Sequence, residues 1–339
     1  MTLETLDPWL QAHMVCPRDQ QKLALGDPQT LHCSSGHTYP VIHGIPVMLL
    51  VEASPTHGIF SVSLAQAREA VAHPSADAPA TTETVDPFVQ KEIGATCGNM
   101  YKSLINQLKD YPIPQLRLPT GNGNAFLDIG CNWGRWCVSA ARMGYRAVGI
   151  DPSLEAVRAA CRIGKQLGVS PLYVVADSRY LPFAPGSFDV VFSYSVLQHL
   201  EREDVRITVQ EIARVLRAGG SSLVQMPNRF GLLNIYYEFR QLFRGPVLFD
   251  VHYWWPWTLR SVFGRAVGPT TLSVDGFFSL NPQKSDLTML PWYFRLIVSI
   301  SEALRKFSAK CPGLVYLADS LYVQSQRHER SLSAKSGVL

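Results

Sequence analysis

The middle of this 339-residue chain alternates short apolar runs with longer segments in which apolar residues recur every three or four positions. The short runs are rich in β-branched and aromatic residues, which predicts strands. They lie at residues 125–129, 147–150, 172–175, 188–192 and 222–225. Strands that alternate with helices form parallel sheets with right-handed crossovers. The fold class expected is therefore α/β, with a Rossmann-like, doubly wound and mainly parallel sheet.

Two amphipathic helices are predicted between these strands. The first follows Ser153, a natural N-cap, and ends at Gly168; its apolar stripe is Leu154, Val157, Cys161 and Leu167. The second has acids at its start and arginines near its end, as the helix dipole favours; its stripe is Val205, Val209, Ile212 and Leu216. Ligands in sheets of this kind bind at the carboxyl ends of the strands, which is where functional side chains are expected.

The remaining sequence differs in character from this alternating region. Residues 1–52 are predicted to form a small β-rich domain, because Cys, Gly and His residues separate short apolar runs there. Residues 53–87 are rich in Ala, Pro, Thr and Ser and are predicted to be a linker that buries little surface. Helical spacing returns at residues 88–109, and residues 328–339 are expected to be a loose tail.

Composition narrows the class of protein. Apolar residues make up 47% of the chain and charged residues 17%, which is enough to bury a sizeable core and unlike a disordered protein. The net charge of +4 comes without a dense Lys/Arg run, so electrostatics leaves RNA open as a partner. The acidic start is unlike a signal peptide, and the apolar stretch 290–300 is broken by Arg295 and too short to span a membrane. Seven scattered cysteines favour a reducing, cytoplasmic location.

Acidic residues mark the carboxyl ends of three successive strands. Asp128 lies just before a tight turn that contains Gly130 and Gly134, where the missing side chains let backbone approach a ligand. Asp151 ends the second strand, at about the distance from the glycine turn at which an acid can hold a ribose diol. Asp177 follows the third strand and offers an acceptor to an exocyclic amine.

The spacing of the turn disfavours NAD as the ligand. A dinucleotide fingerprint requires G-x-G-x-x-G, whereas the corresponding positions after Gly130 hold Asn132 and Arg135. The carboxylate of Asp128 would also repel a pyrophosphate, while it can bind a cationic amino group. The turn therefore favours a ligand with a positively charged end.

The ordered set of motifs resembles the class I methyltransferases, which use S-adenosyl-L-methionine, and especially those of quinone biosynthesis. Its members are D-I-G-x-N-x-G at 128–134, G-I-D at 149–151, A-D at 176–177, L-P-F and F-D within 181–189, L-Q-H-L at 197–200 and R-V-L-R-A-G-G at 214–220. The family has glycine where this chain has Asn132. The resemblance implies a methyltransferase domain over residues 88–327 with a core at 125–227. An acceptor-covering insertion at about 228–310 and a closing antiparallel strand at 318–326 complete it.

The resemblance also implies roles for individual residues. Asp128, Gly130 and Gly134 line the methionine portion of the cofactor, Asp151 binds the ribose hydroxyls, and Asp177 binds the adenine amine. The other cofactor-binding candidates are Asn132, Ser178 and Tyr194. The alternative for Asp128 and Asp151 is helix capping or turn formation.

The amino-terminal block resembles the small zinc-ribbon family whose founding member partners tRNA and release-factor methyltransferases. The resemblance lies in Cys16-Pro-Arg-Asp19, Cys33-Ser-Ser-Gly-His37 and the Tyr-Pro-Val and Gly-Ile-Pro segments within 39–46. A structural zinc site has four ligands in tetrahedral geometry. The candidate metal ligands are Cys16, Asp19, Cys33 and His37, with Asp19 in place of the usual cysteine. The alternative is a ribbon that has lost its metal. In either case the block is expected to be a structural or partner-docking module.

Methyl transfer from a sulfonium is an in-line displacement that needs alignment, desolvation and, for some acceptors, a general base. His199, just beyond the fourth strand, and His252 are the candidate catalytic bases; the alternative for each is a structural hydrogen-bonding role. An aromatic segment around His252 can wall an aromatic or lipid-like acceptor, or else pack in the core; it contains Tyr253, Trp254, Trp255 and Trp257.

The expected function is transfer of a methyl group from S-adenosyl-L-methionine to a small-molecule acceptor that is aromatic, quinone-like or lipid-linked. The first alternative is an rRNA or tRNA methyltransferase, because some such enzymes place a Cys/His zinc module before this fold. The second alternative is a non-catalytic binding or partner-docking module. A protein partner that binds through the amino-terminal ribbon is expected as well.

Overall fold

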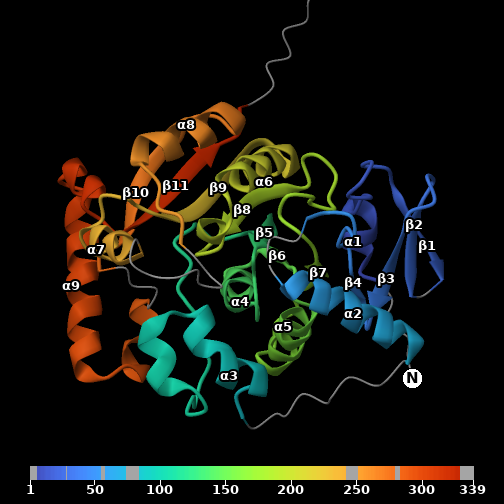
Figure 1. The fold of residues 1–339 in the computed structure, drawn as a ribbon, viewed down its shortest axis with the longest axis horizontal. Coiled ribbons are helices and arrows are strands. Elements are labelled where there is room, and N and C mark those ends of the chain that lie inside the picture. Colours follow the sequence, from blue (N-terminus) through green and yellow to red (C-terminus); the bar gives the residue numbers. More distant parts are fainter. Residues whose placement is uncertain are drawn as a thin grey trace, which may run out of the picture.

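The computed structural model describes residues 6–27, 29–54, 58–73, 84–241, 251–278 and 283–328. Its centre is a seven-stranded sheet with the order β10-β11-β9-β8-β5-β6-β7 (Figure 1). Five strands are parallel, namely β5 (Ala125–Ile129), β6 (Arg146–Asp151), β7 (Leu172–Val175), β8 (Phe188–Ser193) and β9 (Leu216–Pro227). β11 (Ser320–Gln326) runs antiparallel to both of its neighbours, β9 and β10 (Thr270–Gly276). The predicted Rossmann-like, mainly parallel α/β fold is confirmed.

Helices cover both faces of this sheet, because the strands are apolar on both sides. α4 (Arg135–Arg142) and α5 (Leu154–Gln166) share one buried cluster with Phe126 and Tyr173. α6 (Arg202–Val215) and α8 (Pro256–Ala266) share another with Leu127 and Ile150. The α5 start matches the prediction, since the hydroxyl of Ser153 accepts a hydrogen bond from the backbone N–H of Ala156 at 3.2 Å.

The region expected to be an insertion, at about 228–310, contains two elements that pack with the main sheet. α8 packs on α6, and β10 is the edge strand of the main sheet, so residues 256–276 belong to the core fold. β10 escaped prediction because its seven residues include just two apolar side chains, Leu272 and Val274, and its pairing partner, β11, lies far along the chain. What remains between the core elements is α7 (Leu232–Gln241), η3 (Lys284–Met289), α9 (Trp292–Ser308) and η4 (Pro312–Tyr316).

The amino-terminal block is a small antiparallel sheet, as expected, preceded by α1 (Pro8–His13). Its four strands are β1 (Leu23–Asp27), β2 (Thr30–Cys33), β3 (Thr38–Ile42) and β4 (Ile45–Pro46). The chain leaving β4 continues along β7, where the backbone N–H of Met48 donates to the carbonyl of Val175 at 2.7 Å. The N–H of Val15 likewise donates to the carbonyl of Pro182 at 3.0 Å. The small sheet is therefore docked against the β7 edge of the large one (Figure 1).

The segment predicted as a linker contains a helix, α2 (Ile59–Ala72), that packs on the main domain. Phe60 and Ala67 are buried, and the hydroxyl of Ser63 accepts a hydrogen bond from the backbone N–H of Leu154, at the start of α5, at 3.0 Å. The alanine-rich composition that indicated a linker also has high helix propensity, and this helix finds an apolar surface to cover.

The helical spacing at 88–109 corresponds to two elements rather than one. α3 (Pro87–Thr96) ends before Gly98, whose φ of 101° is open to glycine, and η1 (Asn99–Leu104) follows. No helix among the described residues is long and apolar enough to cross a membrane.

Candidate functional site

A left-handed turn joins β5 to α4. Gly130, Asn132 and Gly134 have φ values of 76°, 47° and 80°, and the N–H groups of Gly130 and Cys131 both donate to the carbonyl of Ile150 on β6. Asn132 occupies the position at which related sequences have glycine, and asparagine is the non-glycine residue that best tolerates this conformation. The departure from the family pattern therefore leaves the turn intact.

The packing around the two glycines gives a reason for them beside the expected approach of a ligand. A Cβ on Gly130 would lie 2.3 Å from a methyl group of Val196, and one on Gly134 would lie 2.3 Å from the hydroxyl of Tyr173. The space that a side chain would fill is thus occupied by the protein. Packing and positive φ together explain both glycines.

Asp128 is a buried carboxyl group beside this turn. Its side chain is 1% exposed, and the thiol of Cys137 on α4 donates a hydrogen bond to its Oδ2 at 3.3 Å. Burial raises the pKa of Asp128 to about 7. A cationic partner would stabilise the ionised form of this buried carboxyl group, because it would compensate the cost of burying the negative charge.

Asp151 connects the end of β6 to the turn and to α5. Its Oδ2 accepts from the backbone N–H of Asn132 at 2.9 Å, and its Oδ1 accepts from the N–H of Ser153 at 2.9 Å. Burial raises the pKa of Asp151 to about 6. Each carboxylate oxygen has a second lone pair, so the group can hold the turn and accept from a ligand hydroxyl at once.

Asp177 is already paired in this structure. The guanidinium of Arg179 donates to both of its oxygens, with Nη2 at 2.6 Å from Oδ2 and Nε at 3.2 Å from Oδ1. Arg179 also donates to Asp204 at 3.2 Å and to the carbonyl of Ser54 at 2.7 Å. The neighbouring hydroxyl of Ser178 bonds to that of Thr208 at 3.1 Å. The adenine-binding roles of Asp177 and Ser178 stay predictions.

Tyr194, just beyond β8, belongs to a polar network that sequence reasoning missed. Its hydroxyl donates to Oδ2 of Asp275 at 2.8 Å and accepts from Gln283 at 3.1 Å. Arg117 forms an ion pair with the other oxygen of Asp275 at 3.0 Å. Asp275 is at the end of β10, and Arg117 is in the Pro-rich segment before β5, so no local motif links them. The two residues are brought together only because β10 joins the main sheet.

The two histidines predicted as bases lie on neighbouring segments. The backbone N–H of His252 donates to the carbonyl of Gln198 at 2.8 Å, and the amide of Gln198 lies 3.1 Å from Nε2 of His199. Nε2 of His252 is 3.8 Å from the carboxylate of Glu201, while its buried Nδ1 has no hydrogen-bond partner. Both imidazoles therefore belong to the region beyond the carboxyl end of β8.

The aromatic segment after His252 divides into a core part and a surface part. Trp254 is fully buried, and Tyr253 is nearly so. Trp255 is half-buried and stacks on Trp257 with ring centroids 5.1 Å apart, and Phe230 packs against both. The core alternative thus holds for Trp254, whereas Trp255 and Trp257 form an accessible aromatic cluster.

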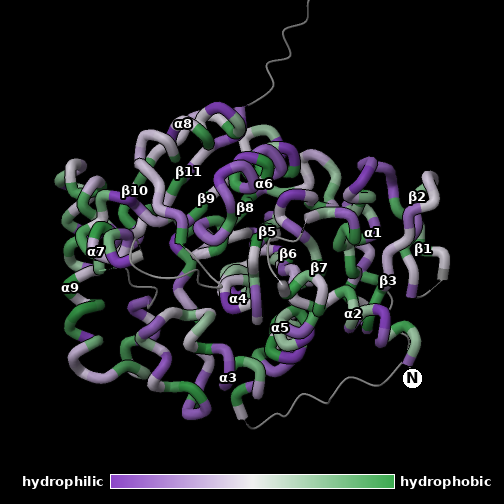
Figure 2. The backbone as a smooth tube through the Cα atoms, in the orientation of Figure 1, coloured by the Kyte–Doolittle hydropathy of each residue, from purple (hydrophilic) through white to green (hydrophobic). Residues whose placement is uncertain are grey.

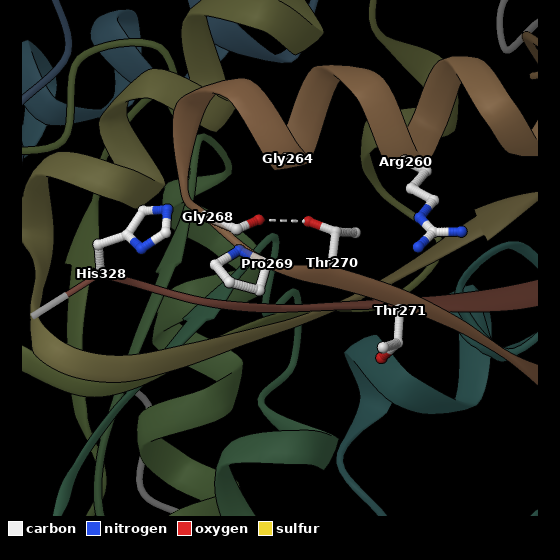
Figure 3. Close-up of a pocket in the computed structure, with 7 residues that line it drawn as sticks. All are labelled: Arg260, Gly264, Gly268, Pro269, Thr270, Thr271 and His328. Atoms are coloured by element: carbon white, nitrogen blue, oxygen red, sulfur yellow. Dashed lines mark hydrogen bonds between the residues drawn. The ribbon is translucent and has the colours of Figure 1, made fainter.

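The predicted site residues follow one edge of the sheet in the order of the strands. Asp177, Asp151, Asp128 and Tyr194 lie at or just after the ends of β7, β6, β5 and β8, which are neighbours. A pocket of about 450 Å³ lies at the opposite, amino edge, between α8 and the start of β10 (Figure 3). Since His328 and Thr270 line it there, that pocket is separate from the candidate site.

The four predicted metal ligands also come together. Nδ1 of His37 lies 3.5 Å from Sγ of Cys16, 3.3 Å from Sγ of Cys33 and 3.2 Å from a carboxylate oxygen of Asp19. All four potential ligand atoms lie within 4.8 Å of one another. Ligand atoms around tetrahedral zinc are about 3.3–3.8 Å apart, so this donor set has nearly the right size and chemistry for zinc.

Comparison with known proteins places the central residues in a family. Residues 127–224 match the model of a family described as a methyltransferase domain. The ubiquinone biosynthesis O-methyltransferases of Agrobacterium fabrum and Rhizobium etli are 35% and 36% identical to the chain over 107 residues, which are 32% of this chain and 42% of each relative. The chain thus matches less than half the length of these relatives.

The solved structures that match this chain are more distant in sequence, and the TM-scores of the two given below are under 0.5. One is a possible histamine N-methyltransferase of Thermotoga maritima, with a TM-score of 0.43 and 16% identity over 62% of this chain and 84% of that one. Another is a chain of the complex between the Trm112 methyltransferase activator of Haloferax volcanii and a putative methyltransferase, with a TM-score of 0.43 and 20% identity over 63% of this chain and 86% of that one.

Residues 127–224 therefore resemble a methyltransferase domain, over a part of this chain and less than half of each relative. The residues around the glycine turn fit S-adenosylmethionine in chemistry. Asp128 is a buried acid that a cationic amino group would stabilise in its ionised form, and Asp151 has lone pairs for hydroxyl donors.

The raised pKa of Asp128 gives a test of this fit. Below pH 7 the carboxyl is mainly protonated in the free protein, and it must lose that proton to pair with a cation. Affinity for S-adenosylhomocysteine should therefore fall as pH drops below about 7, by up to about tenfold per pH unit. Titration calorimetry between about pH 5.5 and 7.5 measures this slope.

Asp128→Asn is the matched variant for this titration. It should bind more weakly above pH 7 and show a flatter profile, because its side chain has no proton to lose. Equal slopes for the two proteins would show that Asp128 does not meet the cationic group.

Proposed function

We propose that this protein transfers a methyl group from S-adenosyl-L-methionine to a small-molecule acceptor. The observation that carries the proposal is the arrangement of Asp128 and Asp151, two buried carboxyl groups on adjacent strand ends beside a left-handed glycine turn. The matching relatives named for ubiquinone biosynthesis support an aromatic, quinone-like or lipid-linked acceptor.

S-adenosylmethionine, when bound, supplies an electrophilic methyl group attached to a sulfonium. In our proposal Asp128 pairs with the amino group and Asp151 accepts from the ribose hydroxyls while it fixes the turn through Asn132. Asp177 accepts from the adenine amine. For this, one of its carboxylate oxygens has to accept from Arg179 and the amine together, or Arg179 has to move away from that oxygen. These contacts orient the methyl group toward the region beyond β8 and β9.

His199 and His252 are the groups that can take a proton from an acceptor hydroxyl in this region. Nε2 of the His252 imidazole lies 3.8 Å from a carboxylate oxygen of Glu201. Trp255 and Trp257 supply flat apolar surfaces close to the same segment. The RNA alternative rests on the Cys/His module of the amino-terminal domain, and the contacts of that domain reported above are made within the chain.

The direct test is a screen of small phenols, catechols and quinols with methyl-labelled S-adenosylmethionine. Wild-type protein should label at least one of them, whereas Asp151→Asn should bind S-adenosylhomocysteine about 10- to 150-fold more weakly, because charge-assisted hydrogen bonds worth roughly 1.5–3 kcal/mol are lost.

Asp110→Asn, at an exposed position before the fold core, is the control and should match wild type. Calorimetry that shows binding of NAD but not of S-adenosylhomocysteine would contradict the proposal.

The half-buried Trp255 is proposed to form part of the acceptor wall. Trp255→Ala should then raise the acceptor's KM or lower kcat by about tenfold and leave S-adenosylhomocysteine affinity unchanged, because the cofactor residues lie on other strand ends.

Its neighbour Trp254 is fully buried and provides the contrast. Trp254→Ala should destabilise the domain by about 3–5 kcal/mol and reduce cofactor affinity and turnover together. Melting temperature, cofactor affinity and turnover measured on both variants separate the two roles. A Trp255→Ala protein that behaves like Trp254→Ala would remove Trp255 from the acceptor wall.

We propose that Cys16, Asp19, Cys33 and His37 bind a structural zinc ion. Three soft or borderline donors and one carboxylate, already gathered around His37, favour zinc over magnesium or calcium. Zinc would crosslink the loop before β1 to the β2–β3 turn and so stiffen the small domain that docks on β7.

Elemental analysis of purified protein should find about one equivalent of zinc, and Cys33→Ser should lose it. Cys311→Ser changes an exposed cysteine remote in sequence and should retain the metal. Stoichiometric zinc in a protein that lacks both Cys16 and Cys33 would show that the metal binds elsewhere.

A further inference from the structure

Helix α9 presents an apolar stripe to solvent along its whole length. Its members recur every three or four residues and are Trp292, Leu296, Ile300, Ala303 and Phe307. Trp292 is 75% exposed, and Leu296 and Phe307 are 55% and 56% exposed. The opposite side of the same helix supplies the buried residues Val298 and Ser301. The outer stripe therefore adds nothing to the core.

Helix α7 repeats the same feature. Leu232, Ile235, Tyr236 and Phe239 follow helical spacing and are all exposed, Phe239 by 61%. Together the two helices carry ten of the seventeen large apolar side chains that are exposed in the described part of the chain. We call these residues of α7 and α9 the α7–α9 surface.

The two helices lie at one end of the long axis of the molecule (Figure 1), and Figure 2 shows hydrophobic residues along both. They are joined through one segment. Asp319 accepts from the backbone N–H of Leu233 in α7 and from that of Phe278, while the hydroxyl of Ser301 in α9 bonds to the backbone of Phe277. The apolar stripes thus belong to one connected part of the fold.

Cations border the apolar stripes. Glu238 is paired with Arg229 and Glu302 with Arg305 and Arg117, so both carboxylates of the two helices are neutralised. No carboxylate among the described residues forms an ion pair with the remaining cations, which are Arg240, Arg295, Lys306 and Lys310. Ser299, Lys306 and Arg295 occupy the helix positions next to the apolar stripe of α9.

We propose that the α7–α9 surface binds the surface of a lipid bilayer that contains anionic headgroups. Tryptophan, tyrosine and phenylalanine with flanking lysine and arginine is the composition of helices that lie in a membrane interface. Interfaces between proteins are instead depleted in lysine. This binding does not depend on the proposed methyl transfer.

The placement would bring the carboxyl edge of the sheet close to the membrane. α7 follows directly after β9, and its first residues are held by Asp319, which precedes β11. An acceptor dissolved in the bilayer would then reach the region beyond β8 and β9 without crossing much water. Membrane binding and acceptor choice are nevertheless separate properties, and each is tested by its own experiment.

The test is sedimentation of the full chain with vesicles of phosphatidylcholine alone or with about 30% phosphatidylglycerol. Wild type should bind the anionic vesicles, and added salt should weaken the binding because headgroup attraction is screened. Leu296→Glu should lower the partition coefficient at least about tenfold, since it replaces an apolar contact by a charge.

Val62→Glu is the matched control, because Val62 on α2 is also 55% exposed but lies outside the α7–α9 surface. It should bind like wild type. Lys306→Glu should weaken binding several-fold on anionic vesicles only, and this change at an exposed lysine leaves the core untouched. All variants should retain wild-type affinity for S-adenosylhomocysteine, which reports on folding.

Three outcomes would overturn the proposal. In the first, wild type stays in the supernatant with both vesicles. In the second, Leu296→Glu binds as well as Val62→Glu. In the third, light scattering detects a wild-type dimer that Leu296→Glu converts to a monomer, with no vesicle binding by either; the surface would then be an interface between two copies.

Discussion

The carboxylate of Asp151 is the contact on which the rest of the site depends. It ends β6, accepts from Asn132 in the left-handed turn and from Ser153 at the start of α5, and is buried. Two backbone N–H groups compensate part of the cost of burying this charge. Because Asn132 has a positive φ, the turn needs an external partner to hold its shape, and Asp151 supplies it. Loss of that carboxylate would disturb the turn beside Asp128 as well as any ribose contact.

The sequence predicted the central fold closely, because its strands are short, apolar and separated by capped helices. β5 and β7 match their predicted bounds, and Ser153 caps α5 as expected. β10 and the Asp275–Arg117 pair were out of reach, since they depend on pairings between segments far apart in the chain. The glycine turn was located correctly, whereas the packing of Val196 against Gly130 could not be predicted, because a contact between distant residues is invisible in a linear pattern.

The amino-terminal domain shows how a weak module is stabilised by its neighbour. Its four strands are short, and the chain after β4 hydrogen-bonds to β7 through Met48, so the small sheet extends an edge that would otherwise be open. The same connection brings Ser54 to Arg179, the partner of Asp177. The docking of this domain is thus coupled, through one arginine, to the carboxylate expected to bind adenine.

Helix α9 illustrates a distinction between residues that fold the protein and residues that serve another purpose. Ser301 and Val298 tie it to the domain, and the hydroxyl of Ser301 satisfies the backbone of Phe277. A polar outer face would preserve all of these contacts and would favour solubility. Trp292, Leu296 and Phe307 instead expose apolar area that gains no free energy in the folded chain. Since neither packing nor capping requires these side chains, their helical spacing and cationic border are better explained by an apolar phase outside the protein than by the fold itself.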